Sequence, residues 1–175
     1  LDDPQAYTAP QLVMLAGRRQ ILIVGAKRAV GVTVEEGALL WEYPWVTHEG
    51  INAAQPIVVS DNSFFISAGY GHGAALVEIS AKGDVFETRT VWKNNRMKNK
   101  FSSSVLFKGF LYGLDEGILA CMDASTGEIK WKGGRYGHGQ ILLASGHLIV
   151  ATEAGEVALV KAMPEKFEEI ARFAA

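Results

Sequence analysis

Three histidines are the residues of this sequence most suited to chemistry, because an imidazole can bind zinc, copper or iron. His48 follows a Trp-Val-Thr stretch, and His72 and His138 each stand in a copy of Tyr-Gly-His-Gly, at residues 70–73 and 136–139. The three come from separate segments and have no short ligand spacing. We therefore favour hydrogen-bonded loop histidines and expect no metal site.

The repeated Tyr-Gly-His-Gly segment indicates either a ligand cradle or a tight turn. Glycine lets the backbone approach a ligand closely, and it also adopts the positive φ of tight turns. Turn geometry is the favoured interpretation of both copies. The spacing of Gly69, Gly71 and Gly73 is not a dinucleotide fingerprint, because it lacks the final glycine spacing and the strand-to-helix context.

The remaining reactive side chains form no recognisable catalytic set. A basic run at residues 93–100 could contact phosphate or an acidic protein, but a solvated loop is favoured and no nucleic acid partner is expected. Cys121 alternates with its neighbours in a predicted strand and is expected to be a small buried side chain. The sequence has no nucleophile–base pair and no Gly-x-Ser-x-Gly elbow, so we expect no catalytic residues.

The elements that must position these residues are short strands separated by glycine-containing turns. In the clearest unit an alternating strand ends at Asp123, a Thr-Gly turn follows, and a second strand carries Trp131. Weaker copies place Trp41, Trp92 and Phe173 at a period of about forty residues. This period, with four strands in each unit, is typical of β-propeller blades.

The expected fold is therefore an all-β propeller of about four four-stranded antiparallel blades, forming one domain over residues 1–175. The blades are expected roughly at residues 7–45, 52–93, 101–133 and 137–175. The last strand, near residues 168–173, could also be a helical turn, and the repeat favours the strand. Because uncovered blades would expose apolar faces, we expect a larger propeller of seven or eight blades, completed by another segment or a second copy.

Composition sets broad limits on function. Apolar residues make up 49% and charged residues 21%, with a formal net charge of −2, which argues against a general attraction to nucleic acid or anionic lipid. No apolar run approaches the roughly 18 residues of a membrane span. The single cysteine excludes an intrachain disulfide and leaves the compartment open. The chain begins at Leu1 without a signal peptide, so we expect that something upstream has been removed.

The long loops are predicted to share one face of the propeller. In a four-stranded blade the connections between blades lie on the same face as the loops between the second and third strands. We call this the connection face and expect it to bind a partner. Its predicted contact residues are Trp45, His48, Asn52, Tyr70, His72, Asn99, Phe101 and His138.

The segment from Asp123 to Trp131 resembles the repeat of PQQ-like β-propellers, whose pattern is roughly Ala-x-Asp-x-x-Thr-Gly-x-x-x-Trp. This family includes BamB-like propellers and quinoprotein dehydrogenases. One copy matches well and three are degenerate. The glycine supplies positive φ, the Asp and Thr cap the turn, and the Trp fills the space between blades. The residues that carry this motif are Trp41, Trp92, Asp123, Thr126, Gly127 and Trp131.

The resemblance implies two possible functions. The first is a non-catalytic protein-binding or scaffold module without cofactors. It would be a periplasmic or otherwise extracytoplasmic subunit of a larger complex, such as a membrane or electron-transfer complex, and would not itself span the membrane. The alternative is a fragment of a PQQ-dependent dehydrogenase that oxidises alcohols or sugars with PQQ and Ca²⁺.

Catalysis by this chain is not expected. Quinoprotein dehydrogenases often stack a disulfide between adjacent cysteines on the quinone, and a single cysteine cannot form one within the chain. The connection face also offers few carboxylates to bind calcium. They are Glu49, Asp115, Glu116 and Glu153.

Overall fold

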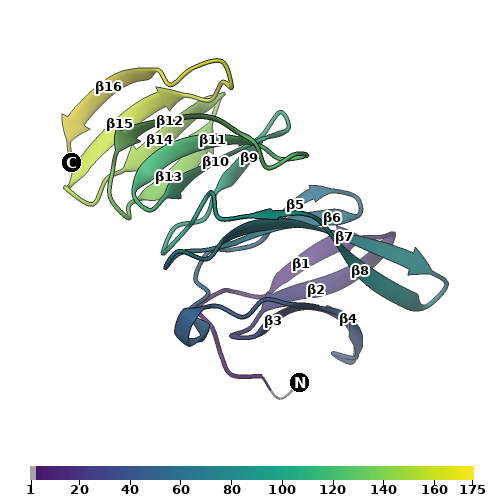
Figure 1. Cartoon of the computed structure of the whole chain (residues 1–175). Coiled ribbons are helices and arrows are strands. Elements are labelled where there is room, and N and C mark those ends of the chain that lie inside the picture. The colour runs from purple at the N-terminus through teal and green to yellow at the C-terminus, as the bar shows by residue number, and fades with distance from the viewer. Residues whose placement is uncertain (1–2) are drawn as a thin grey trace.

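The computed structural model describes residues 3–175, which fold into four sheets of four antiparallel strands (Figure 1). The predicted propeller architecture is confirmed. Blade 1 contains β1 (Gln11–Leu15), β2 (Arg18–Val24), β3 (Arg28–Thr33) and β4 (Leu39–Pro44). Blade 2 contains β5 (Ile57–Ser60), β6 (Ser63–Ala68), β7 (Gly73–Lys82) and β8 (Val85–Asn94). Blade 3 contains β9 (Val105–Phe107), β10 (Phe110–Asp115), β11 (Ile118–Asp123) and β12 (Ile129–Arg135). Blade 4 contains β13 (Gln140–Ala144), β14 (His147–Ala151), β15 (Glu156–Lys161) and β16 (Glu169–Ala174).

The last segment is a strand, as the repeat predicted, and pairs with β15. Within residues 3–175 the helical structure is the single turn η1 (His48–Gly50) between blades 1 and 2. No helix of this described part is long and apolar enough to cross a membrane.

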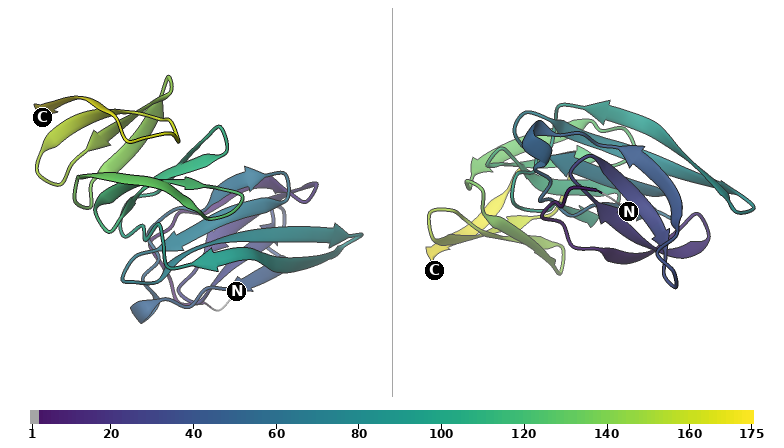
Figure 2. Two further views of the ribbon diagram at one scale, coloured as in Figure 1. Left: turned by 45° about the horizontal axis from the view of Figure 1, so that its top comes forward. Right: turned by 90° about the horizontal axis from the view of Figure 1, so that it is seen from below.

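The four blades stack in sequence order, with the two chain ends at opposite ends of the stack (Figures 1 and 2). The first strands β1, β5, β9 and β13 are neighbours in turn. Each blade has a forward face, toward the next blade, and a backward face, toward the preceding one. Three apolar clusters fill the three spaces between neighbouring blades. Alternation of side chains along each strand supplies both faces of a blade with apolar residues.

A β-bulge recurs at the same place in all four blades and sets the position of the motif tryptophan. The ladder between the third and fourth strands skips Leu40, Val91, Lys130 and Ile170. An extra residue on one strand re-aims the side chain beside it. In blades 1, 2 and 3 the residue after the bulge is a tryptophan, and it pairs with the fourth residue of the third strand. These tryptophans are Trp41, Trp92 and Trp131.

Phe173 does not occupy the tryptophan position of blade 4, as the spacing had suggested. The residue after the fourth bulge is Ala171, which pairs with Leu159, whereas Phe173 pairs with Val157 one step along the same face. Counting residues from blade to blade could not locate the bulge. In blade 4 the small side chain of Ala171 therefore occupies the position that tryptophan has in the other blades.

Trp92 and Trp131 connect neighbouring blades through their indole N–H groups. Trp92 donates from Nε1 to the Ala124 carbonyl at 3.0 Å, and Trp131 donates to the Met163 carbonyl at 2.8 Å. Both acceptors lie between the third and fourth strands of the next blade. Both indoles pack in the apolar clusters between blades with their N–H groups satisfied.

Trp41 satisfies its N–H within its own blade. It stacks on Phe64 of blade 2, with ring centroids 5.4 Å apart, and donates to Gln20 Oε1 at 2.6 Å. The residue of blade 2 that corresponds to Ala124 is Ile79, which is still inside the ladder and pairs with Thr88. The β7–β8 hairpin is longer than its counterparts and projects from the stack (Figure 2). No turn carbonyl is therefore in place for Trp41, and Gln20 takes its role.

The motif turn of blade 3 is built as its sequence predicts. The Asp123 carboxylate accepts from the backbone N–H groups of Ser125 and Thr126 at 2.9 and 3.2 Å, and Gly127 has a φ of 72°. Thr126 Oγ1 accepts from the Glu128 N–H at 3.3 Å. These contacts cap the turn that carries the acceptor for Trp92.

The two end faces of the stack are apolar and uncovered within the described chain. On the forward face of blade 4, Leu142 is 61% and Phe173 is 59% exposed. On the backward face of blade 1, Leu12 and Met14 are more than half exposed. The same faces of the inner blades are buried against a neighbour.

Candidate functional site

The connection face contains five of its eight predicted residues as accessible or half-buried side chains. His48, Tyr70 and Phe101 are exposed, and His72 and His138 are half-buried. They come from the connections between blades and from the β6–β7 loop, as the blade topology predicts.

Trp45, Asn52 and Asn99 are not accessible, so their prediction as contact residues is wrong. Trp45 has 0% exposure and lies in the core between blades 1 and 2. Asn52 donates from Nδ2 to the Gly25 carbonyl at 2.9 Å, and Asn99 donates to the Leu114 carbonyl at 3.2 Å. The accepting carbonyls belong to the β2–β3 loop and to β10, and buried backbone carbonyls need such a partner. These three residues hold the connections down against the blades.

An aromatic groove lies on the connection face. Its volume is about 510 Å³, and it is lined by Tyr7, Ile51, Ala53, Tyr70 and Phe101. Tyr70 is 41% and Phe101 is 51% exposed, although both are large aromatic side chains. Grouped exposed aromatic residues around a hollow are typical of interaction sites. We call these five residues the aromatic groove.

The segments that form the groove are bonded to one another. The Tyr7 N–H donates to the Asn52 carbonyl at 2.9 Å. This bond joins the chain before β1 to the connection between blades 1 and 2, which we call the first connection. The Gln55 N–H donates to Ser103 Oγ at 2.9 Å. This bond joins the first connection to the second connection, which lies between blades 2 and 3. Gly69 lies so close to the second connection that a Cβ there would meet Lys100 Cα at 2.8 Å. The groove is therefore held by contacts between segments distant in sequence.

Lys100 lies between the two exposed rings. Its Nζ is 4.7 Å from the Tyr70 ring centroid and 5.1 Å from that of Phe101. Cation–π contact at these distances is favourable and orients both rings. Each ring also has a histidine neighbour: His48 lies 6.4 Å from Tyr70 and His138 lies 5.8 Å from Phe101, measured between ring centroids.

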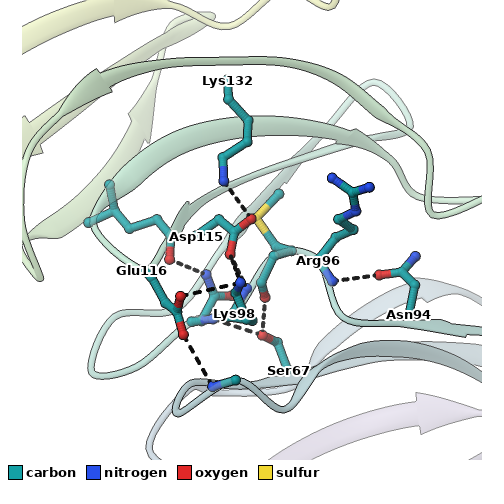
Figure 3. A network of polar contacts seen from close by, with 11 residues as sticks. Ser67, Asn94, Arg96, Lys98, Asp115, Glu116 and Lys132 are labelled. Carbon is teal, nitrogen blue, oxygen red and sulfur yellow. Dashed lines mark hydrogen bonds and ion pairs between the residues drawn. The ribbon is translucent and has the colours of Figure 1, made fainter.

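A polar network fixes the connection between blades 2 and 3 (Figure 3). Asp115, which is 2% exposed, accepts from the Lys98 backbone N–H at 3.0 Å and from Lys132 Nζ at 2.9 Å. Glu116 pairs with Lys98 Nζ at 3.2 Å and accepts from the Gly71 N–H at 3.1 Å. The network thus joins the β10–β11 loop to the connection that carries Lys100 and to the loop that carries Tyr70.

Asp115 stays ionised in this network. Burial would raise the pKa of its carboxyl, but hydrogen bonds from Lys132 and from the Lys98 backbone, with the charges of both lysines, bring the pKa below its ordinary value. Asp115→Ala should lower the free energy of unfolding by about 1–3 kcal/mol near neutral pH, because buried donors lose their acceptor. Urea unfolding of both proteins measures this difference.

The effect of Asp115→Ala should depend on pH. Since the folded-state pKa lies below the unfolded value of about 3.9, the stabilisation is complete above that value and is lost as the pH falls through the folded-state pKa. The difference from wild type should therefore shrink in unfolding measurements below about pH 4. The control is Asp84→Ala, because the Asp84 side chain is 97% exposed. An equal difference at neutral and acidic pH would contradict this role.

The three histidines lie in three separate clusters. His72 packs edge-on against Trp45 at a centroid distance of 4.4 Å, whereas His48 is beside Tyr70 and His138 beside Phe101. Burial, with the positive charge of Lys93, lowers the pKa of His72. Across residues 3–175, no three His, Cys, Asp or Glu side chains come together as a possible metal site.

The two Tyr-Gly-His-Gly copies have different roles. The first forms the β6–β7 loop, and its Tyr70 lines the groove with a φ of 54°. The second lies between blades 3 and 4, where Tyr136 is buried and donates from its hydroxyl to Glu169 at 2.5 Å. Positive φ at Gly71 and Gly137 fits the predicted turn geometry.

The residues on this face do not fit a calcium–PQQ site. Asp115 and Glu116 are held by lysines, and Glu153 accepts from the His138 N–H at 2.9 Å. Cys121 is buried as predicted, in the core between blades 3 and 4, and burial raises the pKa of its thiol to about 11. These side chains stabilise the fold and are not arranged as oxygen or sulfur ligands around a shared centre.

Four residues of the site were missed by the sequence prediction. Tyr7, Ile51 and Ala53 come from polar or irregular stretches whose contact with Tyr70 depends on how the connections fold. Lys100 was recognised only as part of a basic run. Lys100 lies between Phe101, its neighbour in sequence, and Tyr70, which is in another loop. The sequence does not show that Tyr70 is close, so the role of Lys100 could not be read from it.

Comparison with protein families finds a match over most of the chain. The family described as "Outer membrane protein assembly factor BamB" matches residues 2–133. No curated protein sequence matches the chain at a significant level.

Solved structures share the fold at low sequence identity. BamB from Moraxella catarrhalis superposes with a TM-score of 0.63 and 16% identity, covering 88% of this chain and 45% of that one. The N-terminal domain of Nup159 gives 0.61 and 12% identity, covering 99% and 46%. The computationally designed Ika8 protein gives 0.61 and 9% identity, covering 93% and 47%. The chain thus spans about half the length of these structures.

Proposed function

Because this chain belongs to the family of the outer membrane protein assembly factor BamB, we propose that it is a protein-binding propeller module that uses the aromatic groove of its connection face. The observation that carries the proposal is the exposure of Tyr70 and Phe101 around one groove. Large aromatic side chains are enriched at the energetic centres of protein interfaces.

The proposed role is non-catalytic and extracytoplasmic, within a larger complex. Family membership supports an interaction role and, by analogy, a location outside the cytoplasm. The carboxylates of the connection face are engaged in structural bonds, which favours a scaffold over the quinoprotein dehydrogenase alternative. The binding surface is built on blades 1 to 3, so its geometry is held by the stacked sheets beneath it.

A capture experiment tests the proposed function. Wild type and a Tyr70→Ala/Phe101→Ala variant are immobilised and exposed to a detergent extract of source cells, and bound proteins are quantified by mass spectrometry. We expect at least one protein to be retained by wild type and reduced about tenfold by the variant, a loss of about 1.4 kcal/mol of binding free energy. Both side chains are exposed, so the unfolding midpoint should change little.

The matched control is Leu39→Ala/Val85→Ala, which removes two exposed apolar side chains from outside the groove. It should retain the same proteins as wild type. Retention of an unchanged set by the groove variant, or the absence of any protein specific to wild type, would contradict the proposed function.

A further inference from the structure

Lys100 differs from the other lysines near the groove in its charge environment. Lys98 and Lys132 both pair with Asp115, and Lys98 pairs with Glu116 as well. No carboxylate of residues 3–175 pairs with Lys100, whose ammonium contacts only the faces of Tyr70 and Phe101 among the contacts described. A positive charge therefore remains at the edge of an apolar groove.

Three carboxylates of the connection face have contacts of their own. Glu49 pairs with His48 at 3.8 Å, and Glu116 is held by Lys98 and the Gly71 N–H. Glu153 accepts from the His138 N–H. Glu116 is neutralised by Lys98, and no ion pair joins Glu49, Glu116 or Glu153 to Lys100 within the described residues.

The apolar part of the groove has room for side chains of a partner. Ile51 and Ala53 line it together with the rings of Tyr70 and Phe101, and the volume of about 510 Å³ lies within the range of ligand pockets. The ammonium group of a lysine beside such a pocket attracts a carboxylate through its compact positive charge. Its N–H groups can still donate hydrogen bonds while it contacts the faces of the rings.

We propose that the aromatic groove binds an acidic peptide segment of a partner protein, with a large apolar side chain in the groove and a neighbouring carboxylate on Lys100. This inference rests on the proposed protein-binding function and names the chemistry of the partner. The apolar side chain supplies buried area, and the carboxylate supplies orientation and selectivity against basic segments.

Fluorescence anisotropy with three labelled peptides tests this inference. The peptides are Gly-Asp-Trp-Leu-Asp-Gly, a form in which lysine replaces both aspartates, and a form in which serine replaces them. At low salt, we expect the acidic peptide to bind at least about tenfold more tightly than the lysine peptide, with the serine peptide between them. Lys100→Glu should reverse the preference, so that the lysine peptide binds more tightly.

The control for the charge change is Lys82→Glu, at the exposed tip of the β7–β8 hairpin, which should leave the preference unchanged. Lys100→Met, which keeps an apolar stem, should abolish the preference without reversing it. Equal binding of the acidic and lysine peptides to wild type, or an unchanged preference in Lys100→Glu, would overturn the inference. The absence of binding by all three peptides would also overturn the inference. The capture experiment tests the proposed function independently of these peptides.

Discussion

Trp131→Ala is expected to lower the free energy of unfolding by about 3–5 kcal/mol, as for other buried aromatic side chains. The ring lies between blades 3 and 4, with centroids 6.0 Å from Tyr112 and 5.6 Å from Phe167. Its Nε1–H donates to the Met163 carbonyl. The substitution removes the ring and the hydrogen bond together, so blade 4 loses both an aromatic contact and a hydrogen bond to blade 3.

Urea unfolding followed by circular dichroism measures this loss. Trp131→Phe is the informative control, because it keeps an aromatic ring while it removes the N–H and part of the ring volume, and it should cost clearly less than the alanine variant. Since blades interact only with their neighbours, Trp131→Ala should also separate the unfolding of blade 4 from the rest of the stack. A loss below about 1 kcal/mol would mean that the indole is not a principal contact between these blades.

Gly31→Ala is expected to destabilise the protein by about 1–3 kcal/mol, the usual cost of overpacking a buried site. A Cβ at Gly31 would lie inside the van der Waals distance of both Gln20 Oε1 and Trp41 Nε1, the two atoms of the buried hydrogen bond in blade 1. Gln20 can rotate away, but the indole N–H then loses its acceptor. The substitution therefore breaks the contact that replaces the missing inter-blade bond.

Thermal or urea unfolding checks this expectation against Gly25→Ala. The nearest atoms to a Cβ at Gly25 are 3.6 Å away, which is ordinary contact, and its φ is not in the left-handed region. Gly25→Ala should therefore be close to neutral. Equal stability of the two variants would show that the space beside Trp41 is not needed.

The sequence predicted the strands well because each depends on local pattern. Alternating apolar residues and glycine turns mark the strands of all four blades, and the Asp123 turn forms the hydrogen bonds that its residue types suggest. The register within blade 4 was not predictable in the same way. A single extra residue, Ile170, moves Ala171 into the tryptophan position, and spacing alone does not reveal a bulge.

The site was harder to predict because exposure depends on how the connections pack. Topology placed Tyr70 and Phe101 on the correct face, since that follows from strand order. It could not show that Asn52 and Asn99 would turn inward to satisfy backbone carbonyls, or that Trp45 would enter the core. These outcomes depend on contacts between segments that are distant in sequence.

The two uncovered end faces have a consequence for the symmetry of any extended stack. The forward face of blade 4 carries Leu142 and Phe173, whereas the backward face of blade 1 carries Leu12 and Met14. If another unit continued the stack, the forward face of one unit would meet the backward face of the next. Such a contact joins two different surfaces and is therefore heterologous rather than isologous. Heterologous contacts close into a ring only when the rotation from one unit to the next divides a full turn. The side chains packed between neighbouring blades separate one sheet from the next, so the size of these side chains bears on the number of blades at which a ring would close.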